Sequence, residues 1–146
     1  MNLSPDQEAS RLLSLTGNGY LKAMEILEKQ LNVLHLRAQV LMSLAGIVIT
    51  VTGFSGRSIA GTSFVAQVLV ISGLATVLVS AIWVFSRVMT IKWLTTETAE
   101  TPEIILQEII KRRNRKTRAY VVGGRILCLG LLFYSIAFSI MLLNPK

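Results

Sequence analysis

The amino-acid sequence predicts an all-α integral membrane protein with three transmembrane helices. Only 16% of its residues are charged, whereas a soluble domain carries charge at about a quarter of its positions, and three long windows have no charge at all. Apolar residues at heptad spacing precede the first window, and a basic segment precedes the third window. We therefore expect long cytosolic helical extensions of the spans that form a helical bundle, plus a short N-terminal amphipathic helix.

The first expected helix covers residues 4–16 and lies at the membrane periphery. Ser4 and Pro5 form a helix start, with serine as the cap and proline at the first helical position. Two acidic residues follow in the first turn, where they suit the positive end of the helix dipole. A Gly-Asn-Gly sequence then ends the helix.

A long helix is expected over residues 20–54. Its apolar residues recur at alternating spacings of four and three, which is the pattern of a helix packed against another helix. This part is amphipathic as far as Arg37, and residues 38–54 form the first span. The packing positions of the amphipathic part, which we call the seam, are Tyr20, Met24, Leu27, Leu31 and Leu34.

The small residues that follow, from Gly53 to Ser63, predict a short loop. The next helix is expected over residues 64–94, with the second span ending near Phe85. Aromatic residues and then Arg87 follow one another there, which is typical of a cytoplasmic interface. Gln67 is the most costly uncharged side chain of this span, and we expect it to face protein rather than lipid.

A polar linker over residues 95–101 precedes the last expected helix, residues 102–143. Its first turns are apolar, and Ile105 and Ile109 belong to the face that can cover the seam; a second subunit is the alternative cover. The basic residues follow on the same helix, and the third span is residues 126–143.

The basic residues outnumber the acidic ones by 15 to 8, and all except Arg57 and Lys146 lie on one side of the predicted membrane. The positive-inside rule places the N-terminus in the cytoplasm and the C-terminus outside. Contact with anionic lipid headgroups is the first interpretation of the basic cluster. A cytosolic anionic ligand or partner is the second, and nucleic acid is disfavoured because the cations flank apolar spans. The cluster comprises Lys111, Arg112, Arg113, Arg115, Lys116, Arg118 and Arg125.

Small and hydroxylated residues occur within the spans at spacings that place them on shared helix faces. Two interpretations remain open. Either these faces pack helices together, within the chain or between copies, with hydroxyls bonding across the interface, or they line a pore in an oligomer. The residues are Gly46, Ser72, Thr76, Ser80, Ser135 and Ser139.

The sequence offers no clustered catalytic or metal-binding side chains, so we expect neither an enzyme nor a cofactor or metal. His35 is the only histidine and Cys128 the only cysteine, which excludes an internal disulfide framework. No carboxylate lies within a span, and this argues against an ion-coupled transporter.

Three segments together resemble the small transmembrane effector modules of bacterial anti-phage signalling systems, the Pycsar-type and SLATT-type membrane domains. They are residues 34–46 (LHLRAQVLMSLAG), residues 83–87 (WVFSR) and residues 115–120 (RKTRAY). The resemblance implies a module that oligomerises and compromises the bilayer when triggered, and it makes a bacterial inner membrane the expected location. The sequence departs from the pattern because it has no nucleotide-sensing domain, and because Ser86-Arg87 stands where a proline–arginine pair is expected.

The sequence therefore favours a non-enzymatic, oligomeric membrane module of effector or pore type. Its expected partners are membrane lipids and further copies of itself, or the other subunits of a membrane complex. The alternative is a structural or assembly subunit of such a complex, with its cytosolic helical hairpin as the docking surface.

Overall fold

The computed structural model describes residues 4–17, 19–60, 63–90 and 101–143, without the side chains of residues 56–60. In these ranges the fold is all-helical, as the sequence predicts. It consists of α1 (Pro5–Leu15), α2 (Tyr20–Ala60), α3 (Phe64–Val88) and α4 (Pro102–Leu143). The helices α2, α3 and α4 are each long and apolar enough to cross a membrane.

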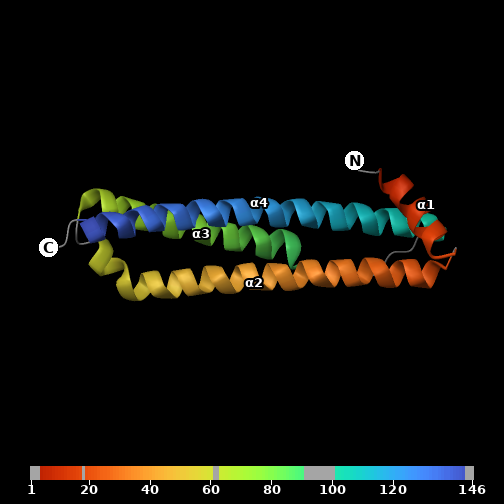
Figure 1. Ribbon diagram of the computed structural model, residues 1–146, viewed down its shortest axis with the longest axis horizontal. Helices are drawn as coiled ribbons and strands as arrows, with labels where there is room; N and C mark the ends of the chain where they lie inside the picture. The colour runs from red at the N-terminus through yellow and green to blue at the C-terminus, as the bar shows by residue number, and fades with distance from the viewer. Residues whose placement is uncertain (1–3, 18, 61–62, 91–100, 144–146) are drawn as a thin grey trace.

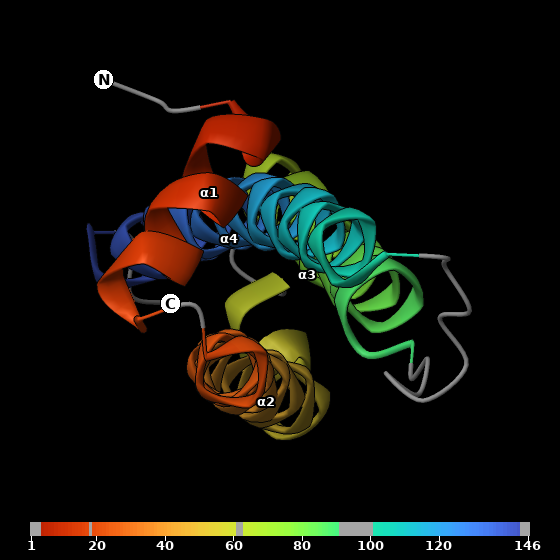
Figure 2. The ribbon, with the colours of Figure 1, turned by 90° about the vertical axis from the view of Figure 1, so that its right-hand side faces the viewer.

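The three long helices form an elongated bundle, shown in Figure 1. Helices α2 and α4 run in the same direction along its length, and α3 runs in the opposite direction beside α4. Because α3 has 25 residues and α4 has 42, α3 covers only part of α4. We call the end of the bundle that holds α1 and the starts of α2 and α4 the basic end, and the opposite end the loop end. Figure 2 views the bundle from the basic end and shows α1 lying across α4.

Helix α1 begins at the predicted cap. The Ser4 side chain accepts a hydrogen bond from the Gln7 backbone at 3.2 Å, and the Gln7 side chain accepts one from the Ser4 backbone, also at 3.2 Å. This reciprocal pair satisfies two backbone donors that the first helical turn leaves without partners. The chain then turns at Gly17, whose φ of 62° is a conformation that favours glycine.

The seam is covered from within the chain. Leu27 and Leu31 of α2 share a buried core with Leu106, Ile109 and Ile110 of α4, and α1 contributes Ala9 to it. Tyr20, Met24 and Ile105 are partly buried against the same core. The structure thus shows the intramolecular partner that the sequence indicated.

A second core joins the apolar spans, and it depends on close contact between α3 and α4. A Cβ atom at Gly130 would lie 2.8 Å from Val77 Cγ2 and 3.0 Å from the Gly73 carbonyl oxygen. A Cβ atom at Gly123 would collide with the side chain of Val84. Glycine at these positions lets the two backbones approach, as small residues do in membrane helix pairs.

Two predicted boundaries differ from the structure. Helix α2 continues through Gly53 to Ala60, where a loop was expected, and its last turns bend toward α4 (Figure 1). Contact with α4 accompanies this continuation, because the Ser55 hydroxyl lies 3.2 Å from the Tyr134 hydroxyl. Helix α3 ends at Val88, short of residue 94. The expected linker lies outside the described residues, except for Thr101.

Candidate functional site

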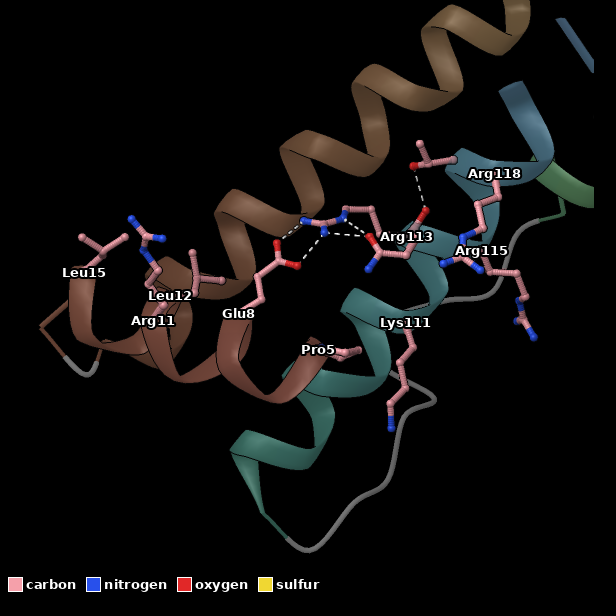
Figure 3. Close-up of a pocket in the computed structure, with 11 residues that line it drawn as sticks. Pro5, Glu8, Arg11, Leu12, Leu15, Lys111, Arg113, Arg115 and Arg118 are labelled. Carbon is pink, nitrogen blue, oxygen red and sulfur yellow. Dashed lines mark hydrogen bonds and ion pairs between the residues drawn. The ribbon is translucent and has the colours of Figure 1, made fainter. Parts of the chain in front are cut away.

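The candidate site is a cleft of about 1010 Å³ between α1 and α4 at the basic end. Figure 3 shows that α1 supplies one wall and the basic turns of α4 the other. Five cations and one carboxylate, Glu8, line the cleft together with apolar and neutral side chains. The cations are Arg11, Lys111, Arg113, Arg115 and Arg118.

Arg113 fastens α1 to the bundle. Its Nη1 and Nη2 atoms donate to the two carboxylate oxygens of Glu8 at 2.7 and 2.8 Å, and Nη1 also donates to Gln30 Oε1 at 2.7 Å. Nε and Nη2 donate to Asn114 Oδ1 at 3.1 and 2.8 Å. These contacts use all five N–H groups of the guanidinium. The ion pair between Arg113 and Glu8 is partly shielded from solvent, because the Arg113 side chain is only 17% exposed. The sequence pattern gave no indication of it, since Glu8 and Arg113 lie far apart in the chain.

The other cations of the cleft are held less firmly. The structure gives Arg11, Lys111, Arg115 and Arg118 no ion-pair partner among the described residues. On α4, the last three recur at spacings of four and three, so they share one exposed face of the helix. Arg125 continues that face toward the span. Arg112 is half-buried on another side of α4.

Lys116 is a buried member of the basic cluster, so its amine cannot contact lipid headgroups. It is 5% exposed, and its Nζ atom donates to the carbonyl oxygens of Val88 and Thr90, both at 2.8 Å. Helix α3 ends there, so these carbonyls lack partners within the helix. Lys116 therefore caps α3 from the neighbouring helix α4. We call this point the lysine junction.

His35 completes the lysine junction from α2, with its Nε2 atom 3.1 Å from Lys116 Nζ. An ammonium group only donates, so Nε2 must accept and the imidazole must be neutral. Burial lowers the pKa of His35, and the charges of Lys116 and Arg112 lower it further, while the Val88 carbonyl acts in the opposite direction. Burial, followed by Arg112 and Arg115, also lowers the pKa of Lys116.

The fold should lose stability as the pH falls below the ordinary histidine pKa of 6.5. In that range the unfolded chain takes up a proton on His35 before the folded protein does, so acid favours unfolding. Thermal unfolding in detergent between pH 7.5 and 5, for the wild type and His35→Gln, measures the effect. The variant should show the shallower pH dependence, and equal slopes for the two proteins would contradict the prediction.

The small-polar residues of the spans have different surroundings. Ser80 is buried and donates to the Gly123 carbonyl at 2.6 Å, which ties α3 to α4. Ser72 and Thr76 are half-buried, and their hydroxyls donate to Leu69 and Ser72 carbonyls of their own helix. Ser135 and Ser139 are exposed and also bond within their helix. Ser80 therefore serves packing within the chain.

Gly46 and Gln67 both lie on the outside of the chain. A Cβ atom at Gly46 would meet nothing within 4 Å, so this glycine makes no close contact within the chain. Gln67 is exposed on the outside of α3, although a costly amide was expected to face protein. Both residues are left for lipid or for another molecule, because a single chain cannot cover every side of three helices.

No group of three His, Cys, Asp or Glu side chains in the described ranges could hold a metal ion. Cys128 is exposed and unpaired. Comparisons with protein-family models, with curated proteins and with solved structures gave no significant match to this chain.

Proposed function

We propose that this protein is a non-enzymatic, homo-oligomeric integral membrane module of the effector or pore type. The observation that carries the proposal is one face of α2 within the first span, which we call the small-polar face. It is exposed, and no other part of the described chain covers it. Its residues are Gln39, Ser43, Gly46, Thr50 and Gly53.

The small-polar face is a continuous strip. At 3.6 residues per turn its five positions fall within about 80° of one another around the helix. Its two glycines would accept a Cβ atom without contact, and the Thr50 hydroxyl donates to the Gly46 carbonyl at 2.9 Å. Strips of small residues allow membrane helices to approach closely, and they gain little from facing lipid.

Helix α2 has a separate face for lipid. Val40, Leu44, Ile47, Val51 and Phe54 are exposed large apolar residues on another side of the helix. The buried residues Ala38, Leu41 and Ala45 face the core. Because lipid and core each have a suitable face already, the small-polar face is the one suited to another copy of α2.

We further propose a bacterial inner membrane, with the basic end of the bundle in the cytoplasm. Both basic segments lie at that end, since α2 and α4 start there, and positive charges are retained on the cytoplasmic side. The loop between α2 and α3 and the C-terminal end of α4 would then lie outside. This orientation places the cleft and the lysine junction in the cytoplasm.

The effector or pore activity, with a role in bacterial defence, is supported by the resemblance to anti-phage membrane modules and by the chemistry of the small-polar face. In an oligomer built on this face, the Gln39 amide and the Ser43 hydroxyl would lie between copies. Polar groups at this interface lower the free-energy cost of letting water enter between the copies when the oligomer rearranges. The Ser72, Thr76 and Ser80 face contributes less, because Ser80 is already bonded within the chain.

The decisive test compares Gly46→Leu with Val51→Leu, which enlarges a residue on the lipid-facing side of the same helix. Mass determination in mild detergent should give a homogeneous homo-oligomer for the wild type and Val51→Leu, and a smaller species for Gly46→Leu. Dye-loaded liposomes should leak with the first two proteins and leak less with the third. A monomeric wild type, or intact vesicles at high protein density, would refute the proposal.

A structural or assembly subunit is the second candidate, and one observation favours it. Leu15 is 75% exposed and Leu21 is 82% exposed at the basic end, where a partner protein could cover them. Co-purification of one partner in fixed ratio from the native membrane, reduced by Leu15→Ser with Leu21→Ser, would favour this function over the first.

A further inference from the structure

The cleft between α1 and α4 has the features of a built anion site. We propose that it binds a soluble, phosphate-bearing anion from the cytoplasm. The inference goes beyond the proposed function, because binding in the cleft can be measured whether or not the protein oligomerises or opens the bilayer.

The charges of the cleft are unbalanced in favour of an anion. Glu8 is its only carboxylate, and that carboxylate is engaged by Arg113 on both oxygens. Four further cations of the lining have no acidic partner in the described chain. Arg11 stands on the α1 wall, and Lys111, Arg115 and Arg118 stand on α4 (Figure 3). Guanidinium groups bind phosphate oxygens in a bidentate manner, so Arg11, Arg115 and Arg118 supply the type of group that a phosphate-bearing anion needs.

Asn114 adds directional donors to the cleft. Its side-chain oxygen accepts two hydrogen bonds from Arg113, which fixes the orientation of the amide. The amide nitrogen carries two further N–H groups, to which the structure assigns no partner in the described chain. Arg113 is a positioning residue here, because all its donors are used in holding α1 and Asn114 in place. The cleft therefore has fixed walls and an oriented donor, rather than only a patch of positive charge.

The position of the cleft along α4 favours a soluble ligand over a lipid headgroup. Helix α4 is continuous from Pro102 to Leu143. At 1.5 Å per residue, Arg118 lies about 12 Å and Lys111 about 22 Å from Ile126, where the span begins. The headgroup layer extends only about 5–8 Å beyond the hydrocarbon. Arg125 is at the depth of the headgroups, whereas the cleft lies deeper in the cytoplasm.

Pyrophosphate is a suitable probe, titrated calorimetrically at constant ionic strength into the full chain held in nanodiscs of phosphatidylcholine. The wild type should bind it. Arg115→Gln with Arg118→Gln should weaken binding by on the order of tenfold or more, because two charged hydrogen-bonding partners are lost. Lys22→Gln with Arg37→Gln removes the same charge from exposed positions of α2 outside the cleft, and should leave the affinity within about threefold, since exposed distant charges are screened.

Asn114→Asp gives an independent variant that keeps the acceptor for Arg113. A carboxylate at this position still accepts from Arg113, but it replaces the amide donors by negative charge, so pyrophosphate binding should fall. Absence of wild-type binding, or an equal loss in the cleft and control double variants, would overturn the proposal.

Nanodiscs that contain phosphatidylglycerol distinguish the two sources of phosphate. Pyrophosphate affinity should remain within about threefold of its value in phosphatidylcholine, because headgroups do not reach the cleft. Loss of pyrophosphate binding in these nanodiscs would show that lipid occupies the cleft, and would overturn the assignment to a soluble ligand.

Discussion

Replacing Gly130 by alanine should lower the free energy of unfolding by about 2 kcal/mol, because it adds a methyl group where two helices are already in contact. The new Cβ atom would lie 2.8 Å from Val77 Cγ2, 3.0 Å from the Gly73 carbonyl oxygen and 3.1 Å from the Val77 backbone nitrogen. Two of these atoms belong to the backbone of α3, so no side-chain rotation can relieve the overlap. The helices must separate, and the nearby bond from Ser80 to Gly123 would weaken.

The matched control is Gly124→Ala on the same helix. Its Cβ atom would meet only Leu41 Cδ1, at an ordinary contact distance of 3.7 Å. Unfolding in mixed micelles with increasing dodecyl sulfate, followed by circular dichroism, measures both variants. Gly124→Ala should be as stable as the wild type or more so, since alanine favours a helix. Equal stability of the two variants would show that close α3–α4 contact does not stabilise the fold.

Replacing Lys116 by methionine should also destabilise the fold by about 2 kcal/mol, because the Val88 and Thr90 carbonyls lose their donor at the end of α3. Methionine fills much of the same volume, so the change mainly removes the amine. Part of this loss of stability is offset because methionine carries no charge. The lowered pKa of Lys116 indicates that burying its positive charge is unfavourable. The end of α3 should loosen before the rest of the bundle, and hydrogen exchange of the last α3 amides should report this.

Lys111→Met is the control for Lys116→Met, because Lys111 is an exposed cation on the same helix. Its stability should stay near that of the wild type. The pH dependence adds a second criterion. A lowered lysine pKa means that the unfolded chain holds its proton to higher pH, so wild-type stability should rise as the pH approaches 10.5. Lys116→Met should lack this rise, and identical profiles would contradict the role of the junction.

The amino-acid sequence by itself determined the helices and the spans. Apolar windows without charge mark the spans because a bilayer penalises every charge placed in it. The heptad from Tyr20 to Leu34 marks a packed helix face, and Ser4-Pro5 marks a helix start because caps depend on local groups alone. The α2 end point was predicted less well, since Gly53 and its neighbours favour a loop, whereas in the structure α2 continues to Ala60 and contacts α4 through Ser55 and Tyr134.

Only the tertiary structure decided which cations serve the fold and which face solvent. Lys116 and Arg115 are neighbours in one basic run, yet a rotation of about 100° about the helix axis separates them. One therefore faces the end of α3, and the other faces solvent at the rim of the cleft. The bond between Glu8 and Arg113 likewise joins residues 105 positions apart, which no local pattern reveals. Contacts of this kind depend on where whole helices come to lie, and the packing of α1 and α2 on α4 fixes that.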